Sequence, residues 1–576
     1  MCIRDRLYHR LALALCFTLA PSLGLAQSDR AATAEQPADT ALTDTSGRPL
    51  IAEQACYDVQ HYTLWLWVDP ANKTIGGELE MRAKMLEASA SIALDLDDRY
   101  SLGGQKRNGK KVELLSRDKG RLFLPTEGIA AGAEFSITIK YSGMPREAPR
   151  PPWKGGFTWA KTKDGSPWIA TSRQGEGADV WWPCKDQPGD EPEGFDLHIS
   201  VPDGLVVASN GSLVGVASTD WGHVSTGDQR PWHTHHWRVS TPISNYSIAL
   251  NIAPYRTISE PFPSLAGHPF EFTYFVLPEN YEKGKAIFAE FREHMAFFED
   301  VCGPYPFRGD KYGVAETPHL GMEHQSIIAY GNGYRGDPNF DYDWLHHHEL
   351  SHEWWANLVT ARDWKDFWIH EGIGTYMQAL YLERRFGPEA YAQKLEIDLL
   401  RVINHGPVAP RGSRSTQQMY FAKEGSEAPG IDIYMKGAWV CHTLRWVLGD
   451  EAFFRVLRRW AYPDPLLEKT TDGSTCRFAD TAEMLRIAEE HGGQELDWFF
   501  EVYLRRASLP SLMSEVQDGK LLLRWSAPDN LPFPMDVPVL VGDQMRRVPV
   551  GPDGARVLLG EQSFQIDPQR RILRVF

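Results

Sequence analysis

The chain has 576 residues, enough for about three or four domains of ordinary size. Hydrophobic residues make up 42% of the chain and charged residues 24%, which excludes a mainly disordered, collagen-like or coiled-coil protein. The 76 acidic residues outnumber the 60 lysines and arginines and give a formal net charge of −16. Such a charge offers no electrostatic attraction to nucleic acid or to an anionic membrane. We therefore predict an acidic, multidomain, soluble protein that does not bind nucleic acid.

The first 26 residues have the three-part pattern of a secretory signal peptide. Three arginines precede an apolar run at 11–20, and small residues at 24–26 stand where a signal peptidase would cut. The run is too short to cross a bilayer, and a short buried helix is the alternative interpretation. We predict a signal peptide at 1–26, export to the periplasm or the cell exterior, and a mature chain without a transmembrane segment.

The pattern of apolar residues predicts where the domains lie. Residues 27–52 contain no aromatic side chain and are rich in small and polar ones, which predicts a flexible tether. From Tyr57 onwards apolar and polar residues alternate, as they do in half-buried strands, and this indicates an N-terminal β-sheet domain at 53–255. The clearest alternating segments are 79–85, 135–141 and 195–201.

Helical spacing then replaces the alternation. Apolar residues recur at helical intervals between 288 and 298, and Gly303 is expected to end that helix. Helical patterns continue and predict an α-rich domain at 256–509, so the predicted fold class is multidomain α+β. Short β patterns return in a small C-terminal β domain at 510–576, namely at 521–525, 537–541 and 572–576.

One short segment, His346-His347-His348-Glu349-Leu350-Ser351-His352, carries the residues for metal chemistry. Among the three consecutive histidines, only His348 has another histidine, His352, four residues later. Positions i and i+4 lie on one face of a helix, so these two imidazoles can bind one metal ion while Glu349 acts as a general base. We predict that the other two histidines are not ligands.

A catalytic zinc needs a third protein ligand and an open fourth position. Glu371 lies 19 residues after His352 in a second helical segment. That gap is long enough for the first helix to end and for a second helix to return its carboxylate to the metal. We predict one Zn²⁺ per chain, bound by His348, His352 and Glu371, in a hydrolase.

Other motifs surround this segment in a fixed order. Q-G-E at 174–176 precedes W-P-C-K-D-Q-P at 182–188, P-Y-P-F stands at 304–307, and Y-M-K-G-A at 434–438. Together with the metal motif they resemble the gluzincin zinc aminopeptidases, the family that contains aminopeptidase N and leukotriene hydrolase. The resemblance extends over most of the chain, from about residue 57 to 510, and implies a thermolysin-like catalytic domain.

The resemblance also implies a set of substrate-binding residues. The exopeptidase loop of the family reads G-x-M-E-N, whereas this chain has Leu320-Gly321-Met322-Glu323-His324. By resemblance, Glu323 and Glu176 bind the free ammonium group of the substrate, for which carboxylates are natural partners. His324 would add positive charge when protonated, below about pH 6.5. The predicted substrate-binding residues are Gln174, Glu176, Gly321, Met322 and Glu323.

These residues together define the predicted reaction. Zinc would activate a water molecule and polarise the substrate carbonyl, and Glu349 would take the proton of the water and pass it to the leaving amine. By resemblance, Tyr434 donates its hydroxyl to the oxyanion that develops. We therefore predict an exported zinc metallo-aminopeptidase whose substrates are peptides with a free N-terminus.

Two alternatives remain open. The altered loop could belong to an endopeptidase or, as in one branch of the family, to an epoxide hydrolase. In a different class, the chain could be a non-catalytic peptide-binding protein, although such a protein has no need of a general base at Glu349. Metal analysis and turnover of free against N-acetylated peptides distinguish these possibilities.

Overall fold

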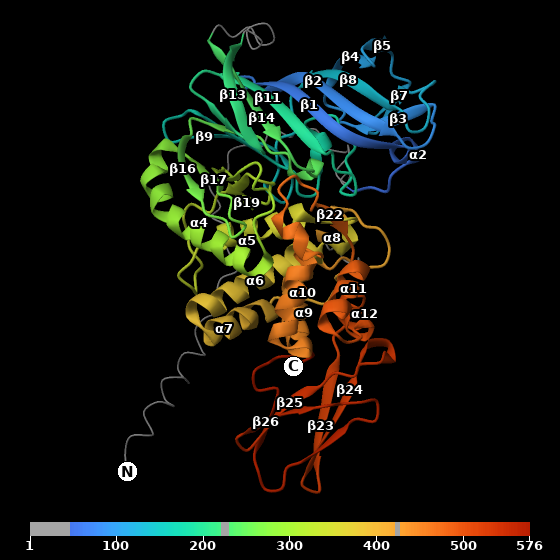
Figure 1. The fold of residues 1–576 in the computed structure, drawn as a ribbon, viewed down its shortest axis with the longest axis vertical. Coiled ribbons are helices and arrows are strands. Elements are labelled where there is room, and N and C mark those ends of the chain that lie inside the picture. Colours follow the sequence, from blue (N-terminus) through green and yellow to red (C-terminus); the bar gives the residue numbers. More distant parts are fainter. Residues whose placement is uncertain (1–46, 220–229, 421–426) are drawn as a thin grey trace, which may run out of the picture. The chain divides into compact units, whose positions relative to one another are not determined.

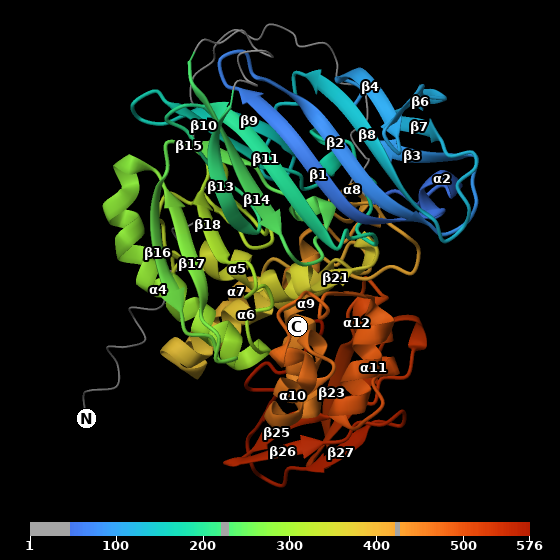
Figure 2. The same cartoon turned by 45° about the horizontal axis from the view of Figure 1, so that its top comes forward.

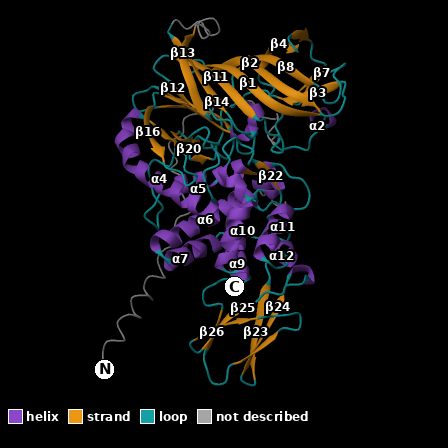
Figure 3. Ribbon diagram, in the orientation of Figure 1, coloured by secondary structure: helices purple, strands orange, loops and turns teal. Residues whose placement is uncertain are grey.

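The computed structural model describes residues 47–219, 230–420 and 427–576. The predicted signal peptide and most of the predicted tether lie outside the described residues. Strands predominate at the beginning and the end of the described chain and helices in its middle, so the predicted α+β class is confirmed (Figure 3). None of the described helices combines the length and the apolar character that crossing a membrane requires.

An eight-stranded sheet dominates the N-terminal part (Figure 1). The predicted alternation is confirmed on the strand at Thr74–Met85, where Leu79 and Met81 are fully buried while Glu80 is partly exposed. One face of the sheet therefore packs on the core and the other faces outward. The strand at Tyr57–Asp69 pairs parallel with the strand at Gly194–Pro202, and all other neighbours are antiparallel. In sheet order the strands are β13 (Ser212–Thr219), β14 (Trp232–Val239), β11 (Gly194–Pro202), β1 (Tyr57–Asp69), β2 (Thr74–Met85), β8 (Glu134–Gly143), β4 (Ser101–Arg107) and β5 (Lys110–Val112).

Two smaller sheets and a short helix complete the N-terminal part. The loop after one of these strands carries Gln174 and Glu176, so this part contributes two of the predicted substrate-binding residues. The elements are β3 (Ser91–Asp95), β7 (Arg121–Pro125) and β6 (Ser116–Asp118) in one sheet, β12 (Val206–Ala208), β15 (Asn251–Ala253), β10 (Pro167–Ser172) and β9 (Gly156–Lys161) in the other, and the helix α2 (Ala52–Ala55).

A five-stranded sheet opens the part of the chain that contains the metal motif. Periodicity did not predict its strands, because three of them are buried along their whole length and therefore show no alternation. The last strand in the sheet order is the edge strand β19 (Gly321–Met322), which carries two residues of the predicted exopeptidase loop at 320–324. In sheet order the strands are β16 (Arg256–Phe262), β17 (Phe270–Val276), β18 (Tyr312–Glu316), β20 (Ile328–Tyr330) and β19 (Gly321–Met322).

Helices make up most of the rest of this part (Figure 2). The predicted helix end is confirmed, since α4 (Tyr281–Cys302) ends at Gly303, whose φ of 107° suits glycine. A short parallel pair, β21 (Val359–Ala361) and β22 (Arg477–Ala479), lies among the helices. The remaining helices are α5 (Trp344–Ser351), α6 (Trp368–Phe386), α7 (Pro388–Leu399), α8 (Thr416–Tyr420), α9 (Met435–Leu448), α10 (Asp450–Ala461), α11 (Thr481–Gly492) and α12 (Asp497–Leu504).

The C-terminal part consists of two three-stranded sheets. The predicted strands at 521–525 and 537–541 are confirmed, but the predicted strand at 572–576 is wrong. The backbone of this segment forms separate hydrogen bonds instead of a strand ladder. Leu573 N–H donates to the Thr443 hydroxyl (3.0 Å), and Val575 N–H donates to the Pro510 carbonyl (2.9 Å). The strands are β23 (Ser511–Gln517), β24 (Lys520–Ser526) and β27 (Ala555–Leu558) in one sheet, and β26 (Gln544–Val548), β25 (Val537–Val541) and β28 (Phe564–Ile566) in the other.

Candidate active site

The helix α5 brings the two predicted histidine ligands together. It begins at Asp343, whose side chain accepts a hydrogen bond from the His346 N–H (2.9 Å), and it ends at Ser351 with His352 as the capping residue. His348 and His352 are four positions apart on one face, and their Nε2 atoms are 3.3 Å apart. Two lone pairs therefore point at one place beside the helix.

The chain leaves the helical conformation directly after His352. Trp355 (φ −104°, ψ 62°) and Ala356 (φ 166°, ψ −54°) break the short turn at Glu353–Leu358. This break turns the Trp355 carbonyl towards His352, and the carbonyl accepts a hydrogen bond from His352 Nδ1 (3.0 Å). Because Nδ1 must carry the proton, Nε2 keeps its lone pair for a metal, as metal-binding histidines commonly do.

Glu371 completes a donor set that fits a tetrahedral metal ion. It lies in the first turn of α6, and its Oε2 is 3.3 Å from His348 Nε2 and 3.5 Å from His352 Nε2. Zinc bonds of about 2.0–2.2 Å in a tetrahedron require neighbouring donors about 3.3–3.6 Å apart. Glu371 Oε2 is buried and has no hydrogen-bond partner among the described residues. The three predicted ligands are thus brought together with an orphaned oxygen facing two imidazoles.

The charges around this point favour a cation. Glu349 and Glu323 lie in the same buried region, where burial and their mutual repulsion raise the pKa of the Glu349 carboxyl well above its ordinary value. Burial alone would lower the pKa of His352, but the neighbouring carboxylate of Glu371 raises it to about 10. Without a metal, a proton on this imidazole is the cation that the carboxylates stabilise. A divalent ion would take that place.

Facing glycines bring Tyr434, the second predicted catalytic residue, to the site. A Cβ atom added at Gly372 would collide with the Cα of Gly437, and one added at Gly437 would collide with the Cα of Gly372. The helices α6 and α9 therefore touch through their backbones at these two glycines. Tyr434, the residue before α9, donates its hydroxyl to Glu371 Oε1 at 2.8 Å.

The edge strand β19 holds the exopeptidase loop against Glu349. It pairs antiparallel with β20, and a side chain at Gly321 would collide with the Glu349 carboxylate. Met322 is buried, and Glu323 follows with 4% of its surface exposed. Glu323 accepts a hydrogen bond from the Tyr246 hydroxyl (3.1 Å). A predicted amine-binding carboxylate therefore lies next to the predicted general base.

The structure corrects the expectation for His324. Its side chain is fully buried, and burial together with the charge of Arg173 holds its pKa well below the ordinary value. It therefore stays neutral and adds no positive charge near pH 6.5, contrary to the prediction from its unperturbed pKa.

Glu176 and Gln174 lie beside the site in ways that the sequence did not indicate. Glu176 is 1% exposed, with Oε1 3.2 Å from Arg146 Nη2 and Oε2 accepting a hydrogen bond from the Gly155 N–H (2.5 Å). Its charge is balanced inside the protein by the guanidinium group of Arg146. The amide of Gln174 donates to the hydroxyl of Tyr420.

Tyr420 is a residue of the site that sequence reasoning missed. Its hydroxyl donates to Glu371 Oε1 (2.9 Å), accepts from the Gln174 amide and contacts the Tyr434 hydroxyl. It lies at the end of α8 in Thr-Gln-Gln-Met-Tyr, which belongs to no motif. Tyr420 and Glu371 are 49 positions apart in the chain, so only the fold shows that Tyr420 contacts this predicted metal ligand.

The other two histidines of the triple run are directed away from the metal ligands. His346 is fully buried, and its ring nitrogens lie within hydrogen-bond distance of His294 Nδ1 (2.9 Å) and the Tyr312 hydroxyl (3.0 Å). His347 is fully buried among aromatic rings, including Phe298 and Tyr381, and neither of its nitrogens has a hydrogen-bond partner among the described residues. Both placements agree with the predicted register.

The fold and this donor set are those of metallopeptidases of the H-E-x-x-H class. The profile of the Peptidase M1 N-terminal domain matches residues 58–246, and that of the Peptidase family M1 domain matches residues 338–500. The chain belongs to peptidase family M1, which confirms the resemblance to the gluzincins.

Individual relatives are similar at low identity. Endoplasmic reticulum aminopeptidase 1 of Rattus norvegicus is 21% identical over 505 residues, which cover 82% of this chain and 51% of the relative. Leukotriene A-4 hydrolase of Xenopus laevis is 24% identical over 362 residues, which cover 59% of this chain and 53% of the relative. The chain thus spans about half the length of these relatives. The crystal structure of an M1 zinc metallopeptidase from Deinococcus radiodurans has the same fold, with a TM-score of 0.61 and 22% identity over 79% of this chain and 95% of that chain.

Proposed function

We propose that this protein is a zinc aminopeptidase that removes N-terminal residues from peptides. The observation that carries the proposal is the donor set of His348, His352 and Glu371 with two further buried carboxylates beside it. Zinc, when bound there, would supply Lewis acidity for water and for the substrate carbonyl. Glu349 would accept and return a proton, and the Tyr434 hydroxyl would donate to the developing oxyanion.

The selectivity for a free N-terminus would come from Glu323. Burial raises the pKa of its carboxyl, and the charge of Glu371 adds to this effect. A substrate ammonium group would relieve this unfavourable burial by pairing with the carboxylate. An acetylated N-terminus carries no charge and would offer Glu323 no cationic group to pair with.

We expect the protein to cleave free peptides much faster than their N-acetylated forms, and Glu323→Gln to remove most of that preference. The measurement is kcat/KM for one peptide in both forms, with wild type and variant. The variant should lose activity on the free peptide and change little on any blocked substrate. Equal kcat/KM for free and acetylated peptides in the wild type would favour the endopeptidase alternative, and bound zinc without turnover of either would favour the peptide-binding protein.

Tyr420 and Tyr434 should differ in role although both bond to Glu371. Tyr434→Phe removes an oxyanion donor, for which we expect kcat to fall about 10²–10³-fold with the metal retained. Tyr420→Phe removes a hydrogen bond to a metal ligand, which typically weakens metal affinity about 10–100-fold. Competition with a chelator and kcat at saturating Zn²⁺ separate the two effects. The assignment fails if Tyr420→Phe keeps its metal affinity and loses kcat as deeply as Tyr434→Phe.

We also propose that the protein is exported to the periplasm or the cell exterior. The basic residues, the apolar run and the small residues of the first 26 positions support this. Cell fractionation with N-terminal sequencing of the recovered protein tests it. Recovery of an uncleaved chain in the cytosol would contradict the proposal.

A further inference from the structure

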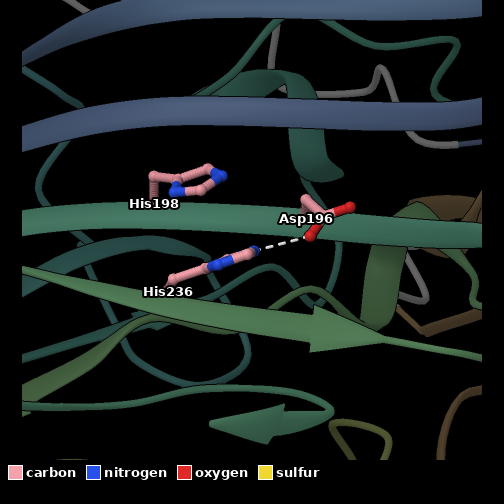
Figure 4. A group of neighbouring side chains, drawn as sticks. All are labelled: Asp196, His198 and His236. Atoms are coloured by element: carbon pink, nitrogen blue, oxygen red, sulfur yellow. Dashed lines mark hydrogen bonds and ion pairs between the residues drawn. The ribbon is translucent and has the colours of Figure 1, made fainter. Parts of the chain in front are cut away.

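A second cluster of metal-binding side chains lies on the eight-stranded sheet, far in sequence from the H-E-x-x-H motif. Its members are Asp196 and His198 on β11 and His236 on β14 (Figure 4). His198 and His236 are directly paired across the antiparallel strands, and Asp196 is two residues before His198 on the same face. Directly opposed side chains have Cβ atoms only about 4.5–5.5 Å apart, so two imidazoles can reach one ion.

The donor atoms of this cluster are close enough for one ion. Each of the three residues offers a donor atom within 4.8 Å of the other two. His236 Nε2 is 2.6 Å from Asp196 Oδ1, and the rings of His198 and His236 stack with centroids 4.0 Å apart. Donors of a tetrahedral ion lie about 3.3 Å apart, which falls between the 2.6 Å that separates His236 Nε2 from Asp196 Oδ1 and the 4.8 Å within which all three donors lie. All three side chains are partly exposed, so the two rings have room to turn towards a shared ion.

Neighbouring side chains orient the donors. The ring of Trp65 on β1 stacks on His198 at 5.4 Å with an angle of 11°. His61 Nε2 is 3.2 Å from Asp196 Oδ2, and Arg238 Nε is 2.9 Å from Oδ1. The Arg238 side chain is 56% exposed and can turn into solvent when an ion takes its place at the carboxylate. Such outer partners fix the orientation of metal ligands.

We propose that Asp196, His198 and His236 form a second metal site, for a divalent transition ion such as Zn²⁺, Ni²⁺ or Cu²⁺. Two imidazoles and one carboxylate are ligands that these ions accept, whereas Mg²⁺ and Ca²⁺ prefer oxygen alone. The site is separate from the donor set at His348, His352 and Glu371. A bound ion would join β11 to β14 and stabilise the folded state in proportion to its binding.

The test uses the full chain with its first equivalent of zinc already bound. Titration with Zn²⁺ should reveal one further equivalent and a rise in Tm. The double variant His198→Gln and His236→Gln should bind this second equivalent at least about tenfold more weakly and lose the rise in Tm. His233→Gln is the matched control, because His233 lies on the same strand but pairs with Asp203 (3.1 Å) and should leave the second equivalent unchanged.

Two further measurements keep the proposal falsifiable if the double variant folds poorly. The single variants Asp196→Asn and His198→Gln should each weaken the second equivalent while the first equivalent stays bound. In the wild type loaded with Cu²⁺ at the second site, electron paramagnetic resonance should show nitrogen ligands that are reduced in His198→Gln. Absence of a second equivalent in the wild type, or equal second-site binding in wild type and variants, would overturn the proposal.

Discussion

Glu349→Gln should leave the zinc bound and lower kcat by about 10²–10⁴-fold, the usual contribution of a general base. The amide has nearly the same shape as the carboxylate, so the close contact with Gly321 and the helix α5 should persist. The amide cannot accept a proton, and this is the one function that the substitution removes. Because the ligands are untouched, KM for free peptides should change much less than kcat.

The measurement is kcat together with metal content and circular dichroism of the purified variant. Glu349→Asp serves as the comparison, since it keeps a base but withdraws it by one methylene group and should fall between the wild type and the glutamine variant. Wild-type kcat in a fully metallated Glu349→Gln protein would show that the base lies elsewhere.

Removing any one of the three ligands should abolish both metal binding and turnover. His348→Ala, His352→Ala and Glu371→Ala each leave two donors, too few to hold a catalytic zinc. The buried carboxylates of Glu323 and Glu349 lie beside the site, so in each variant they lose the cation that balances them. We therefore expect a lower Tm as well as loss of activity in these variants.

The matched control is the neighbouring histidine of the triple run. His347→Leu replaces a buried imidazole that has no hydrogen-bond partner among the described residues by an apolar side chain of similar size. Such a replacement strands no polar partner and should keep the metal. Metal analysis by mass spectrometry decides the register. Loss of zinc from His347→Leu in a folded protein would mean that the ligand set is shifted by one residue.

Local spacing was sufficient to predict the parts of the site that one helix controls. Four residues separate His348 from His352, and helix geometry alone then places their imidazoles on one face. Glu371 was accessible to the same reasoning because it starts the next long helix. The strand alternation at 79–85 was equally visible, since one face of that sheet is exposed and the other is buried.

Contacts between distant segments could not be predicted in this way. Tyr420 reaches Glu371 and Gln174 only because the fold brings three separate segments together. The pairing of Glu176 with Arg146 likewise depends on a loop 30 residues away, and a sequence pattern does not record which charges neutralise each other. Strand β18 was not predicted for another reason: it is buried on both faces, so its sequence shows no alternation of apolar and polar residues.

The carbonyl that orients His352 belongs to the main chain. In many metal sites a carboxylate side chain performs this task and can be deleted by a single base change. Here every residue that could stand at position 355 has the same main-chain carbonyl oxygen. A substitution of Trp355 therefore does not remove the hydrogen bond that sets the tautomer of His352. Loss of this bond requires a change in backbone path between Glu353 and Leu358, for instance by insertion or deletion. In a library of single substitutions, tolerance at Trp355 should therefore be limited by the packing of its ring and not by the chemistry of the metal ligand.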